Sequence, residues 1–307
     1  MFILASIFIK IILPIFILIA IGFVAQKKLK MDSLTFSRMT IYVFIPAVLF
    51  IKMYTAKVDL QFFATIIVFV ITVQILMFII AEAAGRLFGY SRSKRKAFSN
   101  ALTFFNSGNY GLPLADLVFK ASPVAASVQV FIMMVQNVTG NTIGVFQASS
   151  ANSSYRTALR HVFRMPSLYV LFLVLFINYF NLVVPEQVMV PLKYISDSFI
   201  AVALITLGVQ LAEIEFTYRI DDVLLPCFIR LILSPLLGLL LVLAMGIKGE
   251  LAPALIIGVS TPAAVNTAIF AKEYNNEPDY AAKVVFYSTL LSGLSISLVI
   301  YLLKHLG

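Results

Sequence analysis

The chain has no tryptophan, one cysteine, two histidines and only 12% charged residues among 307 positions. The single cysteine, Cys227, excludes an intrachain disulfide and a cysteine metal site. Neither histidine has a metal-ligand neighbour at helical spacing, so no metal and no cofactor is expected. Walker A, HExxH, GxSxG and paired-carboxylate patterns are also absent. The sequence therefore does not indicate an enzyme or an ATP-driven pump.

Apolar residues dominate what is present. They make up 61% of the chain, and the mean hydropathy is +0.99, which no soluble domain reaches. A membrane-spanning helix needs roughly 20 apolar residues. Ten such stretches are expected, at residues 4–25, 36–54, 60–84, 97–120, 124–148, 165–183, 189–211, 222–246, 251–271 and 279–303. We predict an all-α polytopic membrane protein with ten transmembrane helices and no extramembrane domain.

The net charge of +9 is distributed unevenly along these stretches. Fourteen Lys and Arg fall in connections that follow odd-numbered helices, against six on the opposite side. The positive-inside rule makes the first group cytoplasmic, so both chain termini are expected outside the plasma (inner) membrane. Basic loops placed in this way contact lipid headgroups, and a nucleic-acid partner is not expected.

The ten stretches divide into two sets of five. The most polar connection, residues 149–164, separates a first repeat at 1–148 from a second at 165–307. Because five is odd, the halves enter the membrane in opposite directions, which predicts a 5+5 inverted repeat.

Two of the membrane-length stretches are interrupted by polar residues, glycine and proline. FFNSGNYGLPLADLVF covers residues 104–119, and IIGVSTPAAVNTAIF follows about 150 residues later at 256–270. The first segment lies in the fourth predicted helix of the first half, and the second lies in the fourth predicted helix of the second half. Paired breaks of this kind are the best sequence pointer to a transporter's binding site.

The local chemistry of both breaks favours an anion. Thr261 precedes Pro262 as an N-cap precedes a first helical proline, and Pro113 is expected to open the helix after Asn109. Opening exposes N–H groups at helix N-termini, which carry partial positive charge. The alternative is a pair of ordinary proline kinks, satisfied by neighbouring side chains. The substrate-binding candidates are Asn106, Ser107, Asn109, Tyr110, Pro113, Thr261, Pro262, Asn266 and Thr267.

Other polar residues inside the spans have two interpretations each. Asp116 is a candidate site for a coupling H⁺ or Na⁺, or a surface residue paired with Lys120. Arg230 is a second coupling-ion or substrate candidate, but a structural role, at the cytoplasmic side or bracing Asp221 or Asp222, is favoured. Helix 5 adds Gln136 and Asn137 as further substrate-binding candidates, with interhelical hydrogen bonding as the alternative.

The motif NSGNYGLPLADLVF resembles the helix-4 signature of the auxin efflux carrier family, which includes plant PIN exporters and bacterial malate-like and malonate-like permeases. Later segments are similar too: ITLGVQLA, RLILSPLLG, TPAAVNTAIFAKEY and STLLSGLSISLVIYLL. The resemblance covers essentially the whole chain. Unlike plant members, which often carry a long cytosolic loop, this chain has about 16 residues between helices 5 and 6, as in a bacterial short form.

The resemblance implies a specific architecture. Helices 4 and 9 cross around the substrate, as in bile-acid symporters and NhaA-type antiporters. Helices 1, 2, 6 and 7 form a scaffold that mediates a homodimer, and the remaining helices move as an elevator.

Together these observations predict a secondary active transporter of a small organic anion, auxin-like or a mono- or dicarboxylate, with H⁺ or Na⁺ as the candidate coupling ion. A receptor or sensor on the same scaffold, or an anion channel, is the alternative.

Overall fold

The computed structural model describes residues 2–56, 60–120, 122–149, 163, 165–214 and 222–306. Among these residues the regular elements are helices, and a single isolated antiparallel bridge occurs, which confirms the predicted all-α class. Almost all of the expected linker 149–164 falls outside the described residues, as do the basic residues Lys57, Arg156, Arg160, Arg164 and Arg219.

The helices follow one another along the chain with short connections. Those of the first half are α1 (Phe2–Ile7), η1 (Phe8–Ile12), α2 (Leu13–Leu29), α3 (Ser33–Met39), η2 (Thr40–Phe44), α4 (Ile45–Ala56), α5 (Leu60–Leu87), α6 (Arg92–Thr103), η3 (Ser107–Gly111), α7 (Leu112–Val118), α8 (Pro123–Thr139), η4 (Gly140–Gly144) and α9 (Val145–Ala148). Those of the second half are α11 (Pro166–Tyr179), α12 (Glu186–Ala212), α13 (Leu224–Phe228), η5 (Ile229–Leu233), α14 (Ser234–Ala244), α15 (Leu251–Val259), α16 (Val265–Glu273) and α17 (Pro278–Leu306).

In the part of the chain that the structure describes, seven helical stretches are long and apolar enough to cross a membrane. They are Ile3–Leu29, Ser33–Ala56, Gln61–Leu87, Pro123–Ala148, Glu186–Ala212, Leu224–Ala244 and Pro278–His305. An eighth apolar helix, α11, is shorter. The two remaining predicted spans, 97–120 and 251–271, each form two short helices with a break between them. The chain is thus a multi-pass membrane protein.

Large apolar side chains on the outside of the molecule agree with a lipid environment. On α11, Phe172 is 62% exposed, and on α14, Leu243 is 68% exposed. Contiguous apolar surface of this kind is rare on soluble monomers but contacts acyl chains without cost. The helices satisfy their own backbone groups, as lipid requires.

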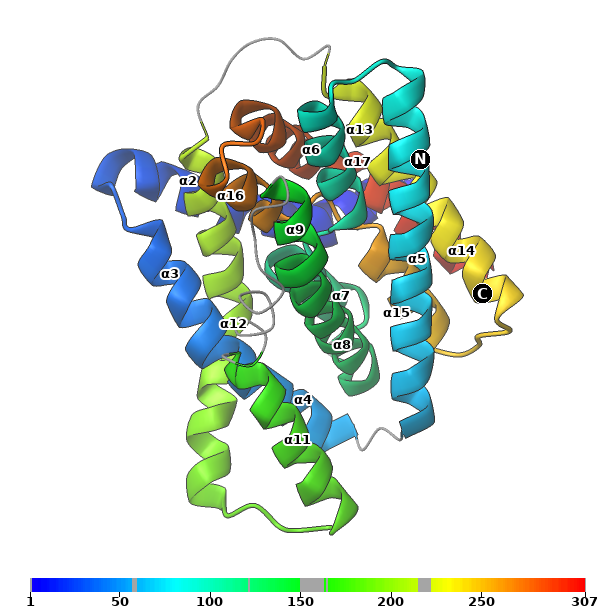
Figure 1. Cartoon of the computed structure of the whole chain (residues 1–307). Helices are drawn as coiled ribbons and strands as arrows, with labels where there is room; N and C mark the ends of the chain where they lie inside the picture. The colour runs from blue at the N-terminus through cyan, green and yellow to red at the C-terminus, as the bar shows by residue number, and fades with distance from the viewer. Residues whose placement is uncertain are drawn as a thin grey trace.

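One group of helices packs around α12. This helix lies along α2 and α4, and α11 packs on α4 beside it (Figure 1). The α2–α12 contact is close because a glycine faces the other backbone on each side. A Cβ atom built on Gly22 would lie 2.1 Å from the carbonyl oxygen of Ile205, and one on Gly208 would lie 2.0 Å from that of Ile19. Small residues at such contacts are typical of membrane helix pairs.

A second group surrounds the two broken segments. Helix α5 packs on α6 and α8, α14 packs on α15, and α16 packs on α17. Figure 1 shows α7, α8 and α9 in the middle of the molecule, between α12 and α5. Five π-helical turns interrupt the α-helices of the described residues. Such turns occur often at functional sites. Here η3 follows the first of the two breaks, and η5, between α13 and α14, carries Arg230.

Candidate functional site

The two broken segments meet in the interior of the protein. Helix α6 ends at Thr103 and the chain becomes helical again at Ser107, while α15 ends at Val259 and α16 begins at Val265. The intervening residues are hydrogen-bonded to each other: the Asn106 amide donates to the Pro262 carbonyl at 2.8 Å, and the Ala264 amide donates to the Phe104 carbonyl at 3.0 Å. We call this pairing the crossing. It brings together breaks that are about 150 residues apart in the chain.

The prolines lie elsewhere in the breaks than the sequence predicts. The first helix opens at 104–106, well before Pro113, and the π turn η3 then continues directly into α7. A proline lacks an N–H, and the altered hydrogen bonding of the π turn accommodates it. In the second break, Thr261 and Pro262 belong to the non-helical segment between α15 and α16, and Ala264 is the N-cap. The predicted proline-opened helix after Asn109 and the Thr261–Pro262 helix start are therefore wrong.

Arg230, from η5, binds the backbone on both sides of the crossing. This side chain is fully buried, and its Nη1 donates to the Leu102 carbonyl at 2.9 Å, its Nε to the Thr261 carbonyl at 3.0 Å, and its Nη2 to the Val259 carbonyl. Its guanidinium also lies 4.7 Å from the centre of the Phe105 ring. The last carbonyls of α6 and α15 have no helical partner and carry partial negative charge. Arg230 satisfies both ends at once.

The predicted carboxylate partners of Arg230 are not the groups that it binds. Asp222 forms an ion pair with Lys94 instead, at 3.4 Å, and Asp221 lies outside the described residues. Full burial also excludes a side chain that reaches the cytoplasmic surface.

The candidate polar residues of the crossing differ in burial. Asn106, Ser107 and Thr267 are buried, Asn109 is half-buried and Asn266 is exposed. The hydroxyl of Thr267 donates to the Ala264 carbonyl at 2.7 Å. Thr261 is buried as well, and its hydroxyl donates to the Gly258 carbonyl at 2.8 Å.

Asn106 has an unpartnered donor at the crossing. Its Nδ2 is buried and has no hydrogen-bond partner, although its backbone groups are paired with Pro262 and Gly111. A buried donor without a partner is costly, by about 1–3 kcal/mol. Buried polar groups are rarely left this way, so Asn106 is the residue of the crossing that most needs a ligand.

One face of α8 follows the crossing closely. Gly111 faces the Gln129 amide, Gly108 faces Met133, and Phe104 lies against Gly140. By this register, the next residue on that face, Gln136, is level with the residues between Gly108 and Phe104.

The amides of α8 differ in their hydrogen bonds. Gln136 is 6% exposed, and both of its side-chain polar atoms lack a partner. The Nε2 of Gln129 donates to the Ala254 carbonyl of α15 at 2.8 Å, while its Oε1 is unpartnered. Asn137 is half-buried, and its carbonyl accepts from the Asn141 side chain at 2.8 Å. Gln136 thus brings a free amide to the level of Asn106, whereas Gln129 fixes α8 to α15.

Helix α17 supports the crossing from another side. Ser288 Oγ accepts a hydrogen bond from the Ala263 amide at 3.2 Å. The Tyr110 hydroxyl is hydrogen-bonded to Ser292 Oγ at 2.9 Å, and Tyr110 is fully buried. The serine spacing of this helix predicts close packing, and two of its serines also position the broken segments.

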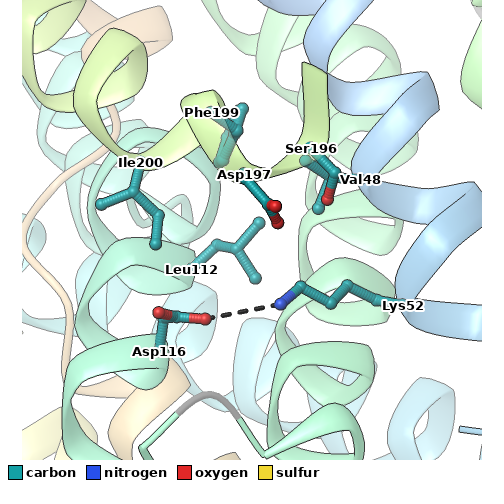
Figure 2. Close-up of a pocket in the computed structure, with 8 residues that line it drawn as sticks. All are labelled: Val48, Lys52, Leu112, Asp116, Ser196, Asp197, Phe199 and Ile200. Carbon is teal, nitrogen blue, oxygen red and sulfur yellow. Dashed lines mark hydrogen bonds and ion pairs between the residues drawn. The ribbon is translucent and has the colours of Figure 1, made fainter. Parts of the chain in front are cut away.

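Asp116 pairs with Lys52 of α4, not with Lys120. The Lys52 Nζ lies 3.4 Å from Asp116 Oδ1, and both side chains are about one-fifth exposed. Figure 2 shows the pair at the wall of a cavity between α4, α7 and α12. This cavity has a volume of about 140 Å³. Its lining residues are Val48, Lys52, Leu112, Asp116, Ser196, Asp197, Phe199 and Ile200.

Lys52, Ser196 and Asp197 are not among the site residues predicted from the sequence. One signal was available, because Asp197 is an ionisable residue in the middle of the predicted span 189–211. Such residues are rare in membrane helices and mark functional positions.

Comparison with known proteins supports a transport role for this fold. Residues 7–300 match the family model described as membrane transport protein. The chain is 22% identical over 294 residues to an uncharacterized transporter of Methanothermobacter thermautotrophicus, covering 94% of this chain and 95% of that protein. It is 26% identical over 253 residues to auxin efflux carrier component 6 of Arabidopsis thaliana, covering 74% of this chain and 43% of the plant protein.

These matches show that the chain is a membrane transport protein. It belongs to the auxin efflux carrier family, which confirms the resemblance carried by its motifs. The aligned part is less than half the length of the plant carrier but nearly the whole of the archaeal transporter.

Proposed function

We propose that this protein is a secondary active transporter that binds a small organic anion at the crossing. The observation that carries the proposal is the set of unpartnered, buried amide atoms there, on Asn106 and Gln136. A passive membrane anchor gains nothing from interrupted helices and unsatisfied donors in hydrocarbon. A ligand with several acceptor oxygens would satisfy these groups.

An anion suits the site for an electrostatic reason. The helices that begin at Ser107 and Val265 start beside the crossing, and the N-terminus of a helix carries partial positive charge and unpaired N–H groups. Asn109 and Asn266 add amide donors close to those termini. A carboxylate accepts hydrogen bonds from such groups readily. Because a relative is named an auxin efflux carrier, aromatic monocarboxylates belong with malate-like and malonate-like acids among the candidate substrates.

We infer a ten-span topology of two inverted repeats, 1–148 and 165–307. The matching positions of the two breaks support it, since each lies in the fourth stretch of its half. The Lys and Arg distribution supports a plasma-membrane orientation with both termini outside.

An elevator movement agrees with the way the helices group. The α2, α4, α11 and α12 helices pack together and would form a stationary scaffold, whereas the broken segments with α8 and α17 would move as one body. We propose a homodimer held by the scaffold, as the family resemblance implies. A receptor would respond to the ligand without moving it, and a channel would conduct without saturating.

The test is flux through the full chain reconstituted in liposomes, with a panel of labelled monocarboxylates and dicarboxylates. We expect saturable uptake of at least one acid, driven by an imposed H⁺ or Na⁺ gradient. Binding without movement would indicate the receptor alternative, and non-saturating conductance would indicate the channel. If no acid is bound or moved under any gradient, the proposal fails.

A further inference from the structure

The cavity in Figure 2 lies between the two groups of helices, apart from the crossing. Its walls come from α4 and α12 on one side and from α7 on the other. Val48, Leu112 and Phe199 are almost completely buried and form its apolar lining. The polar lining residues are Lys52, Asp116, Ser196 and Asp197.

The charges in the cavity are unbalanced. Lys52 pairs with Asp116 at 3.4 Å. Asp197 lines the cavity at its solvent-accessible edge, since this residue is exposed, and Figure 2 shows its carboxylate projecting inward from α12. No ion pair of Asp197 occurs among the residues that the structure describes. Two carboxylates and one ammonium leave a net charge of −1, which one monovalent cation would neutralise.

Ser196 gives a second, independent indication of a ligand. It is only 4% exposed, its Oγ has no hydrogen-bond partner, and it lines the same cavity. A buried hydroxyl without a partner is uncommon. With the two carboxylates it offers an all-oxygen set, which hard cations prefer. Among the described residues, no group of three or more His, Cys, Asp or Glu is suited to a metal ion. The net charge of −1 in the cavity is matched by one monovalent ion, whereas a divalent ion would leave an excess positive charge.

We propose that this cavity binds Na⁺ through the carboxylates of Asp116 and Asp197 and the hydroxyl of Ser196. Lys52 acts as the competing internal cation that neutralises Asp116 when sodium is absent. A volume of about 140 Å³ holds the ion together with a few waters, each of which occupies about 30 Å³. Sodium entry loosens the Lys52–Asp116 pair and joins α7 to α12.

The position of the cavity connects it to the crossing. Leu112, in its wall, directly follows the π turn that contains Asn109, and Asp116 is one helical turn further along α7. An ion on Asp116 is therefore bound to the same half-helix whose start faces the organic anion. The role of Na⁺ as coupling ion rests on the proposed transport function, whereas the binding itself does not.

The test measures sodium binding to the purified full chain in nanodiscs without any organic acid. Radioactive Na⁺ binding gives the affinity, and melting temperature is compared in NaCl, KCl and choline chloride at equal ionic strength. We expect saturable binding and a melting temperature raised by NaCl above the other two salts. Asp197→Asn and Asp116→Asn should each weaken Na⁺ binding about 10- to 150-fold, the range expected for losing a charged oxygen partner.

Two further variants separate an ion site from a structural ion pair. Asp279→Asn removes the same charge from an exposed residue at the start of α17 and should leave Na⁺ affinity unchanged. Lys52→Gln removes the internal competitor and should raise Na⁺ affinity. If Lys52 and Asp116 formed only a structural pair, Lys52→Gln and Asp116→Asn would both lower stability. Neither variant would then change the effect of sodium on the melting temperature.

Equal protection by NaCl, KCl and choline chloride would overturn the proposal. So would a Na⁺ affinity that is the same in Asp197→Asn, Asp116→Asn and Asp279→Asn. A chain that binds sodium in this way but moves no acid would instead contradict the transport function alone.

Discussion

Arg230 determines much of the local geometry at the crossing. It is fully buried in an apolar protein, and its donors are directed at the carbonyl ends of two half-helices. The ends of broken helices are the least stable backbone positions in a membrane protein, because lipid offers no hydrogen bonds. A guanidinium satisfies several acceptors from one residue with fixed geometry, which a lysine does not.

Replacing Arg230 by Met should destabilise the protein strongly. Methionine fills much of the same volume but leaves the Leu102 and Thr261 carbonyls without a side-chain donor, at roughly 1–3 kcal/mol each. The Val259 carbonyl keeps only its hydrogen bond from the Ser234 hydroxyl. Thermal stability of the detergent-solubilised variant, followed by size-exclusion chromatography, gives the readout. Arg86→Met is the control, because that side chain is 72% exposed and belongs to a surface pair with Glu82. Equal stability of the two variants would contradict the bracing role.

Asn106→Ala should affect binding without loss of stability. The Asn106 Nδ2 has no hydrogen-bond partner within the protein, so its removal leaves the melting temperature unchanged or raises it. Ligand affinity should fall by about 10- to 150-fold, the equivalent of a hydrogen bond to a charged group.

Gln187→Ala is the matched control, because it removes an exposed amide at the start of α12. A destabilised Asn106→Ala protein with full affinity would show that Asn106 is structural.

At the scale of elements, α2 and α12 approach each other more closely than any other helices that meet at a glycine of the described residues. The Cβ of any other residue at Gly208 would fall 2.0 Å from a backbone oxygen of α2, and a backbone cannot move aside as a side chain can. Gly208 belongs to the motif ITLGVQLA, whose sequence alone does not tell which neighbour it faces.

Gly208→Val should therefore separate α2 from α12 and lower stability by about 1–3 kcal/mol or more. Gly140→Ala, at another helical glycine, should be tolerated, since its nearest neighbour would be a Phe104 ring carbon at 3.8 Å. Melting temperatures of both variants test this. Similar losses for the two would argue against a backbone-limited contact.

The sequence predicted the elements better than their details. The helical stretches could be predicted because a chain in lipid must satisfy its backbone hydrogen bonds internally. The two breaks could be predicted from the polar, glycine and proline residues of NSGNYGLP and STPAAVNT. The exact ends of the helices did not follow from the sequence, because Pro113 is accommodated next to a π turn and Pro262 lies in the non-helical segment before α16. Arg230's carbonyl partners and the Lys52–Asp116 pair depend on contacts 29 to 128 residues apart, which no local pattern encodes.

At the scale of the whole molecule, the distribution of positive charge predicts which loops face the cytoplasm. In a Cys227→Ala background, a cysteine at Ser93, in the basic 86–96 segment, should react with an impermeant thiol reagent only after permeabilisation of the cells. A cysteine at Lys248, between α14 and α15, should react in intact cells. Both positions are exposed. The reverse pattern would invert the proposed orientation.

The proposed transport function requires that the crossing binds an organic anion and that the protein carries this anion across the membrane. Counterflow in liposomes tests it most directly, with the acid that gives the strongest flux in the panel. Trapped unlabelled acid should drive a transient accumulation of labelled acid above equilibrium in the parent protein. The double variant Asn109→Ala/Asn266→Ala should require about 10- to 150-fold more acid for the same effect, while Gln187→Ala behaves as the parent. Equilibration without an overshoot, or an unchanged concentration dependence in the double variant, would contradict anion transport through the crossing.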